Sequence, residues 1–150
     1  MDPGAQQRLE LCRLAVSGDE RLGICELEVK RGGPSYTVAT LRELHERAPE
    51  DDLTFIVGGD IALGLPSWHE PEAVLDLATL AVAERSGRHD VTERLEQAFP
   101  GRASLRFFDM PRMDVSSSEI RRRVAAGHSI RYLVPDPVAE RIARERLYIT

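Results

Sequence analysis

The sequence predicts an α/β fold in which a mainly parallel sheet is flanked by helices. Short apolar runs of strand length, at residues 53–57, 79–83 and 105–108, alternate along the chain with longer segments of helical periodicity. Strands and helices that alternate at this spacing are typical of parallel sheets, because each crossover returns the chain to the same end of the sheet. The 150 residues contain no internal repeat or low-complexity tract, so we expect one domain over residues 1–150.

The first third of the chain contains two predicted elements. Residues 6–17 carry apolar side chains close to helical spacing, and Gly18 provides a stop signal. From Gly23 to Val29 apolar residues alternate with glutamates, which predicts a strand with one solvated face near the edge of the sheet. Cys12 and Cys25 lie in these apolar patterns and are predicted to be reduced thiols in the core.

The middle of the chain alternates between helix and strand. A helix is predicted to begin near Tyr36-Thr37, and residues 53–57 form a candidate buried parallel strand. This strand ends in Gly58-Gly59-Asp60. Open α/β sheets place ligands at the carboxyl ends of their strands, although an ordinary turn between a strand and a helix has the same composition.

The following elements continue the alternation. Pro71 fits the first position of a helix, residues 79–83 form the next strand, and a helix is predicted at about 91–99. Residues 105–108 form a further strand. The last helix, which contains Val138, Ile142 and Leu147, follows the break at Pro135-Asp136-Pro137 and completes a C-terminal helical portion.

The segment from Val115 to Arg121 carries two independent signals for the start of a helix. Ser116 and Glu119 have the spacing of a capping box, in which each side chain accepts a hydrogen bond from a backbone amide of the other. Val115 and Ile120 have the spacing of a hydrophobic staple. A helix is therefore predicted to begin at Ser116 and to end at Gly127.

The same helix terminus is a candidate site for phosphate. The amides of Ser117 and Ser118 point out of the predicted terminus, where the helix dipole favours an anion. Arg121 lies about one turn further on, and its side chain leans back toward the terminus. Hydroxyls, amides and a guanidinium together can hold a triphosphate. The alternative is that Val115–Arg121 form only a well-capped helix start with a solvated arginine.

Composition and motif content exclude several classes of protein. The formal net charge of −5 argues against a broad nucleic-acid surface, and no apolar run approaches the ~18 residues of a membrane span. The two cysteines form no zinc-binding pattern, and the motifs GxGxxG, GxxxxGK[ST], HExxH and GxSxG do not occur. These observations favour a cytoplasmic protein that contacts neither nucleic acid nor membrane.

Five segments, taken in order and at their spacing, resemble bacterial nicotinate-nucleotide adenylyltransferases. They are Arg31-Gly32-Gly33-Pro34-Ser35-Tyr36-Thr37, Phe55-Ile56-Val57-Gly58-Gly59-Asp60, Leu65-Pro66-Ser67-Trp68-His69, Val115-Ser116-Ser117-Ser118-Glu119-Ile120-Arg121, and Ile130-Arg131-Tyr132-Leu133-Val134-Pro135. The resemblance runs from about residue 5 to Tyr148. It implies a Rossmann-like nucleotidyltransferase fold.

The resemblance also implies a reaction and its substrates. The family transfers the adenylyl group of ATP to nicotinate mononucleotide, which gives nicotinate adenine dinucleotide and pyrophosphate in NAD biosynthesis. The expected ligands are therefore ATP, with its bound Mg²⁺, and nicotinate mononucleotide. On this resemblance Ser117, Ser118 and Arg121 hold the ATP phosphates, and Gly58 and Asp60 contact nucleotide.

The resemblance implies a nicotinate subsite as well. Trp68 would stack on the pyridine ring, and amides near Thr37 and His69 would receive the carboxylate. Backbone donors favour a carboxylate, which only accepts hydrogen bonds, over an amide, and this is a physical basis for preferring nicotinate to nicotinamide. The segment Glu84-Arg85-Ser86-Gly87 resembles a family Arg-Pro-Gly loop, from which Ser86 departs.

The main departure from the family lies at the start of the chain. The family opens with a strand, a glycine-rich turn and a His-x-Gly-His signature that grips the ATP phosphates, and this sequence contains no such signature. We therefore expect a nucleotidyltransferase-like domain that lacks the first β-α-β unit, through truncation, a late start site or degeneration. No catalytic residue is identified in the chain itself, and its own activity is an open question.

Three functional hypotheses remain open from the sequence. The leading one is the adenylyltransferase, and the second is a non-catalytic nucleotide-binding or regulatory module that retains the pocket. The third is a sister adenylyltransferase with another phosphorylated acceptor. Loss of a first strand would expose a sheet edge, which also leaves assembly into a homo-oligomer open.

Overall fold

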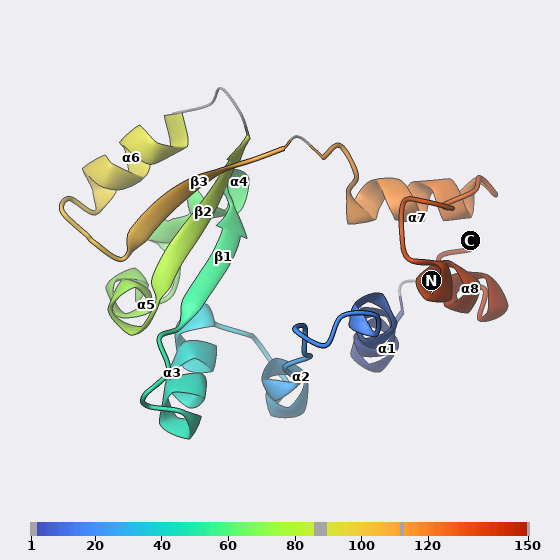
Figure 1. The fold of residues 1–150 in the computed structure, drawn as a ribbon, viewed down its shortest axis with the longest axis horizontal. Coiled ribbons are helices and arrows are strands. Elements are labelled where there is room, and N and C mark those ends of the chain that lie inside the picture. The colour runs from blue at the N-terminus through green and yellow to red at the C-terminus, as the bar shows by residue number, and fades with distance from the viewer. Residues whose placement is uncertain (1–2, 86–89, 112, 150) are drawn as a thin grey trace. The chain divides into compact units, whose positions relative to one another are not determined.

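The computed structural model describes residues 3–85, 90–111 and 113–149 (Figure 1). The chain divides into two compact units, one formed by Gly33–Arg112 and one that combines Met1–Gly32 with Met113–Thr150. The prediction of one domain over residues 1–150 stays a prediction.

The unit Gly33–Arg112 is built on a three-stranded parallel sheet, as the alternation of strands and helices predicts. Its strands are β1 (Thr54–Gly58), β2 (Thr79–Arg85) and β3 (Leu105–Met110), in the order β1-β2-β3 (Figure 1). Thr54 pairs with Thr79 and Leu80 pairs with Leu105, so paired residues lie 25 positions apart in both pairings. The three strands therefore end at the same edge of the sheet.

Helical segments lead into the first strand and connect the later ones, and they cover one face of this sheet. They are α3 (Thr37–Arg47), α4 (Gly59–Ala62), the short 3₁₀ helix η1 (Leu65–Ser67), α5 (Pro71–Leu77) and α6 (Asp90–Ala98). The main core joins alternate residues of the strands to α4, η1, α5 and α6, and its members are Val57, Ala62, Leu65, Leu75, Leu80, Val82, Val91, Leu95, Phe99 and Leu105. Burial of this apolar face is the main driving force for the folding of the unit.

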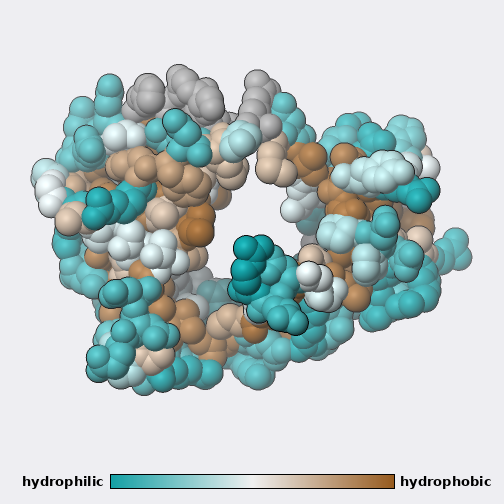
Figure 2. Space-filling view, in the orientation of Figure 1, coloured by the Kyte–Doolittle hydropathy of each residue, from teal (hydrophilic) through white to brown (hydrophobic). Residues whose placement is uncertain are grey.

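The opposite face of the same sheet is more exposed, and this corrects one expectation. The segment 53–57 was expected to be a buried strand, but β1 lies at the edge of the three-stranded sheet and Ile56 is 66% exposed. Phe108 of β3, on the same face, is also exposed. On the face of the molecule that Figure 2 shows, hydrophobic side chains lie exposed between hydrophilic ones.

The second unit contains four helices in the described residues: α1 (Ala5–Val16), α2 (Leu27–Arg31), α7 (Ser117–Ala125) and α8 (Asp136–Arg144). Its core joins the later segments through Ile120, Ile130, Val138, Ile142 and Leu147. Leu11 and Leu14 of α1 pack against this cluster. The predicted helices at 6–17, after Ser116 and after Pro135 are confirmed. Within the described ranges, no helix has both the length and the apolar character to cross a membrane.

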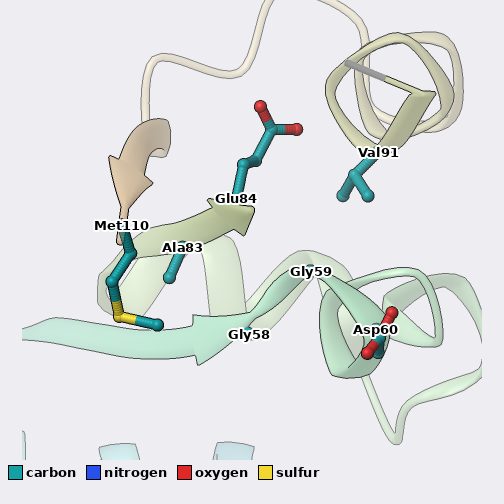
Figure 3. A pocket seen from close by; sticks show the side chains of 7 residues that line it. All are labelled: Gly58, Gly59, Asp60, Ala83, Glu84, Val91 and Met110. Atoms are coloured by element: carbon teal, nitrogen blue, oxygen red, sulfur yellow. The ribbon is translucent and has the colours of Figure 1, made fainter. Parts of the chain in front are cut away.

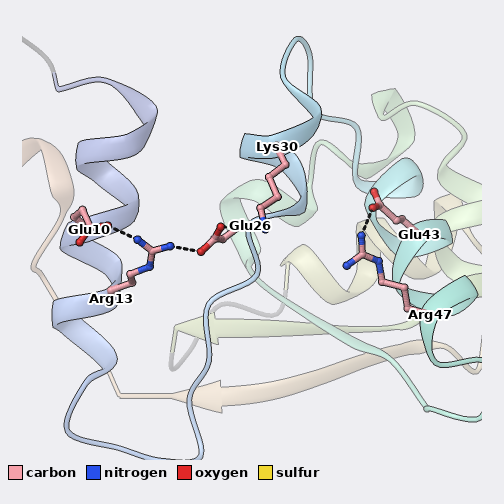
Figure 4. Close-up of polar contacts among 6 residues, drawn as sticks. All are labelled: Glu10, Arg13, Glu26, Lys30, Glu43 and Arg47. Atoms are coloured by element: carbon pink, nitrogen blue, oxygen red, sulfur yellow. Dashed lines mark hydrogen bonds and ion pairs between the residues drawn. The ribbon is translucent and has the colours of Figure 1, made fainter.

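The predicted strand at Gly23–Val29 is wrong. The chain there is irregular up to Glu26, which caps α2, and Glu26 forms an ion pair with Lys30 one turn later (3.3 Å). Glu26 also binds Arg13 of α1 (Figure 4). In this segment Glu26 therefore pairs with cations at the start of a short helix, and the segment forms no strand. Cys12 and Cys25 are free thiols and both are exposed, so their assignment to the core is also wrong.

Two helices end in the same hydrogen-bonded motif with different residues at its left-handed position. After α7, Gly127 (φ 69°) takes this position, and the amide of His128 donates to the carbonyl of Arg123 (2.8 Å). After α8, Arg146 (φ 54°) takes it, and the amide of Leu147 donates to the carbonyl of Ile142 (3.0 Å). The left-handed conformation suits glycine and strains a residue with a Cβ.

We therefore expect the variant Arg146→Gly to stabilise the protein, by up to about 1 kcal/mol, because it relieves the left-handed strain. For a chain of this size the midpoint of thermal unfolding should rise by about 2–4 °C per kcal/mol. The reciprocal variant Gly127→Ala should lower it. Circular dichroism on heating measures both, and a lower midpoint for Arg146→Gly would show that the arginine side chain contributes more than its backbone conformation costs.

Candidate functional site

A cavity of about 110 Å³ lies at the carboxyl edge of the sheet. Each strand contributes to it where the strand ends (Figure 3), and the lining residues are Gly58, Gly59, Asp60, Ala83, Glu84, Val91 and Met110. Gly58 is the last residue of β1 and the cap of α4, so Asp60 lies in the first turn of that short helix. The predicted ligand position at the strand end thus coincides with a real cavity.

Packing beside this cavity is close at position 59. A Cβ atom added to Gly59 would lie 3.2 Å from Cγ2 of Val91, in the first turn of α6. This distance is shorter than ordinary van der Waals contact, so a Cβ at position 59 requires the Val91 side chain to shift by a few tenths of an ångström. The glycine pair therefore serves packing at Gly59, whereas a Cβ on Gly58 would meet no atom within 4 Å.

Glu84 is a cavity residue that the sequence analysis did not assign. Among the described residues it is the one charged side chain that is buried, at 6% exposure. Its Oε1 accepts hydrogen bonds from the amide (3.1 Å) and the hydroxyl (2.8 Å) of Thr92. The carboxylate of β2 therefore caps the first turn of α6 and fixes this helix beside the cavity. The signal was present in the sequence, because Glu84 follows Leu80 and Val82 on the buried face of the strand.

We expect Glu84→Ala to lower the free energy of unfolding by about 1–3 kcal/mol, because it leaves the two half-buried Thr92 donors without this acceptor. Glu84→Gln retains one acceptor oxygen and should cost less. Urea unfolding measures both values, and Glu96→Ala, at an exposed site on α6, is the matched control. Equal stability of all three variants would contradict the capping role.

A second pocket, of about 290 Å³, brings together two segments that are distant in the sequence. It is lined by Ser35, Tyr36, Thr37, Ser67, Trp68 and His69. Its volume lies near the lower end of the roughly 300–1,000 Å³ typical of ligand pockets, which suits one aromatic ring with its substituent. The three residues that the resemblance assigned to nicotinate, Thr37, Trp68 and His69, all lie in this pocket.

The two walls of this pocket offer different chemistry. Thr37 is the first residue of α3, and the intrahelical bonds begin with the amides of Ala39 (3.0 Å) and Thr40 (3.3 Å) to the carbonyl of Tyr36. The amides of Thr37 and Val38 therefore lie at the positive end of an 11-residue helix, which favours an anion.

Trp68 supplies the aromatic surface of the opposite wall. It is half-buried, and its ring packs edge-on against Phe55 with 6.2 Å between ring centroids. The rings of Tyr36 and His69 also meet, with 4.6 Å between centroids. A flat apolar face beside helix amides can bind an aromatic acid.

The start of α7 has the serine half of the predicted capping box, whereas the Glu119 carboxylate is engaged by Arg122. The hydroxyl of Ser116 accepts from the amide of Glu119 (3.1 Å), which leaves the amides of Ser117 and Ser118 as the outward donors of the first turn. The carboxylate of Glu119 accepts from Arg122 (2.6 Å). Arg121 is half-buried and lies five residues after the cap. The three predicted phosphate ligands thus belong to the first two turns of one helix.

Comparison with known proteins identifies the family. Residues 4–123 match the family model described as cytidylyltransferase-like. A relative from Herpetosiphon aurantiacus, described as a probable nicotinate-nucleotide adenylyltransferase, is 39% identical over 147 residues, which are 97% of this chain and 74% of the relative. A relative from Exiguobacterium sibiricum with the same description is 40% identical, with the same coverage. The chain belongs to the nicotinate-nucleotide adenylyltransferase family.

Solved structures confirm the nucleotidyltransferase fold. A Plasmodium falciparum nicotinic acid mononucleotide adenylyltransferase complexed with NaAD has a TM-score of 0.74 and 17% identity, over 97% of this chain and 75% of that one. The same enzyme complexed with APC has a TM-score of 0.72 and 18% identity. At this identity the likeness concerns the fold alone, and it confirms the predicted Rossmann-like nucleotidyltransferase architecture.

The structure therefore assembles the predicted residues of this family member into three local groups. Gly58 and Asp60 share the strand-end cavity, and Thr37, Trp68 and His69 share the second pocket. Ser117, Ser118 and Arg121 share the start of α7. The ligand roles of these residues stay predictions. In the segment that resembles an Arg-Pro-Gly loop, Ser86 and Gly87 lie outside the described residues.

Proposed function

We propose that this chain transfers the adenylyl group of ATP to nicotinate mononucleotide, giving nicotinate adenine dinucleotide and pyrophosphate in NAD biosynthesis. The observation that carries the proposal is the pocket in which two distant segments, Ser35–Thr37 and Ser67–His69, meet. This pocket joins an aromatic face to the amides of a helix start, which is the chemistry that an aromatic carboxylate requires. Membership of the family supports the same reaction.

In this proposal the pocket positions the acceptor. The ring of Trp68 stacks on the pyridine, and the amides near Thr37 and His69 receive the carboxylate. These donors reward a group that only accepts hydrogen bonds, whereas the NH₂ of a carboxamide would face them with further donors. The pocket therefore selects nicotinate mononucleotide over nicotinamide mononucleotide.

ATP is held by other residues. Ser117 and Ser118 donate to the phosphates from the start of α7, and Arg121 binds them through its guanidinium. Gly58 and Asp60 contact nucleotide at the strand end. Mg²⁺ accompanies ATP and neutralises phosphate charge. The ion would be held mainly through the phosphates that Ser117, Ser118 and Arg121 bind, so it would need no dedicated cage of carboxylates.

The proposed chemistry is a direct displacement. A phosphate oxygen of the mononucleotide attacks the α-phosphorus of ATP in line, a P–O bond forms, and the bond to pyrophosphate breaks. Such transfer depends on positioning and on stabilisation of charge, and we assign no covalent nucleophile to this chain.

The experiment is a comparison of acceptors. The protein is incubated with ATP, Mg²⁺ and, in turn, nicotinate mononucleotide, nicotinamide mononucleotide or phosphopantetheine, and pyrophosphate release is measured. The proposal requires turnover that is greatest with nicotinate mononucleotide. Preference for phosphopantetheine would identify a sister enzyme. Calorimetric binding of ATP and nicotinate mononucleotide without any turnover would identify a nucleotide-binding module.

A further inference from the structure

An ion pair joins the two segments, Ser35–Thr37 and Ser67–His69, that line the pocket proposed to bind nicotinate. Arg42 of α3 donates to Glu70 through both terminal nitrogens, with distances of 3.0 Å to Oε1 and 2.6 Å to Oε2. Oε1 of Glu70 also lies 3.3 Å from Nε2 of His69, a residue of the pocket wall. One carboxylate is therefore shared between a helix on one side of the pocket and a side chain on the other.

The backbone at Glu70 is strained. Its φ of 50° and ψ of 60° place it in the left-handed region, which glycine adopts freely and which a residue with a Cβ enters at a cost. Glu70 also precedes the first turn of α5, where its carbonyl accepts from the amide of Val74 (3.2 Å). A glutamate in this conformation needs other contacts to offset the energetic cost of its backbone. We infer that the contacts of its carboxylate with Arg42 and His69 provide them.

These contacts close a ring around the pocket. Helix α3 supplies Thr37 to one wall and, five residues later, Arg42 to the ion pair. The other wall runs through Trp68 and His69 directly into Glu70. The walls are therefore joined at two points, through the rings of Tyr36 and His69 and through Arg42 and Glu70.

We propose that Arg42 and Glu70 form a clamp that sets the spacing of the two pocket walls, and that Arg42 is a positioning residue that favours acidic over neutral pyridine nucleotides. Arg42 performs the second role by neutralising Glu70, which would otherwise place a negative charge beside the site for the carboxylate. This inference rests on the proposed function and adds a determinant of its specificity.

The charge argument requires Glu70 to be ionised at neutral pH. Hydrogen bonds from Arg42 hold the pKa of Glu70 below its ordinary value of 4.5, and His69 acts in the same direction only when it is protonated. A carboxyl group with a lowered pKa stabilises the clamp above pH 4.5, and this contribution is lost as the pH falls through the pKa of the folded protein. At neutral pH removal of Arg42 therefore leaves an uncompensated negative charge.

The pair can be tested without unfolding the protein. The side chains of Arg42 and Glu70 are 47% and 43% exposed, and ion pairs this exposed contribute little to global stability. Trp68 is the single tryptophan of the chain, so its fluorescence reports on this pocket directly. Arg47 pairs with Glu43 on the same helix (2.6 Å; Figure 4) and provides a matched control away from the pocket lining.

The test titrates Trp68 fluorescence with nicotinate mononucleotide and with nicotinamide mononucleotide. We expect Arg42→Ala to weaken binding of the acid about three- to tenfold and to change binding of the amide by less than about twofold. The double variant Arg42→Ala/Glu70→Gln should recover part of the lost affinity for the acid, because it removes the uncompensated charge. Arg47→Ala should match the wild type. An equal loss for both ligands, or none, would overturn the specificity role.

A second measurement tests the clamp without ligand. Quenching of Trp68 by acrylamide should be stronger in Arg42→Ala than in the wild type or Arg47→Ala, because the pocket walls separate. Unchanged quenching would overturn the clamp. If the wild type binds neither nucleotide while quenching still rises in Arg42→Ala, the proposed function fails and the clamp stands, so the two failures are distinguishable.

Discussion

Arg121→Ala is expected to lower kcat/KM for ATP about 100-fold, because a guanidinium that binds phosphate through two charge-assisted hydrogen bonds contributes about 3 kcal/mol. The start of α7 should survive the change, since its cap depends on Ser116 and on the amide of Glu119. Steady-state kinetics with ATP as the varied substrate, together with calorimetry of ATP binding, measure the effect.

Arg122→Ala is the matched control for this prediction. It removes the same charge from the adjacent position, where the side chain is 73% exposed and pairs with Glu119 (2.6 Å). Adjacent residues point about 100° apart around a helix, so Arg122 should not reach a phosphate held by Arg121. Equal losses in both variants would indicate a general effect of charge, and no loss in either would refute the assignment of the phosphate site to α7.

Trp68→Ala is expected to raise the KM for nicotinate mononucleotide about tenfold or more, since stacking on an aromatic side chain contributes about 1–3 kcal/mol per base. The KM for ATP should change much less. Initial rates with each substrate varied in turn provide the comparison. A larger rise for ATP than for the mononucleotide would count against the stacking role.

The alanine variant also removes packing, so a second variant is needed. Trp68 packs against the main core and against the cluster of Val38, Leu41, Val74 and Ala78, and truncation there will lower stability. Trp68→Phe preserves an aromatic contact with Phe55 and a smaller stacking face. It should fold like the wild type and show an intermediate KM, and a wild-type KM would restrict the role of Trp68 to packing.

The sequence predicts most of this architecture because its strongest patterns are local. The three strands, the helices after Tyr36 and Pro71, and the cap at Ser116 follow from periodicity, proline and capping signals within a few residues. The strand expected at Gly23–Val29 does not form, because its alternating glutamates include one that makes ion pairs instead. Glu26 pairs with Arg13 of another helix, and a contact between separate elements leaves no trace in local periodicity.

The candidate site divides in the same way. The glycines and acid after β1 could be placed at a cavity, since strand ends in parallel sheets converge on one edge. The ion pair between Arg42 and Glu70 could not be predicted from the sequence. It joins residues 28 positions apart and depends on a left-handed backbone in a residue that is not glycine. Its partners become evident only when helix α3 and the turn before α5 lie side by side.

The constant offset of 25 residues between paired strands has a consequence for how the sheet forms. Closing β1 on β2 and closing β2 on β3 each restrict the same length of chain, so loop-closure entropy ranks neither pairing above the other. Apolar burial does distinguish them. The first connection contributes five buried apolar residues, Ala62, Leu65, Val74, Leu75 and Ala78, whereas the described part of the second contributes three, Val91, Leu95 and Phe99. The first pairing therefore has the larger driving force, and it is the pairing that completes the strand end at Gly58.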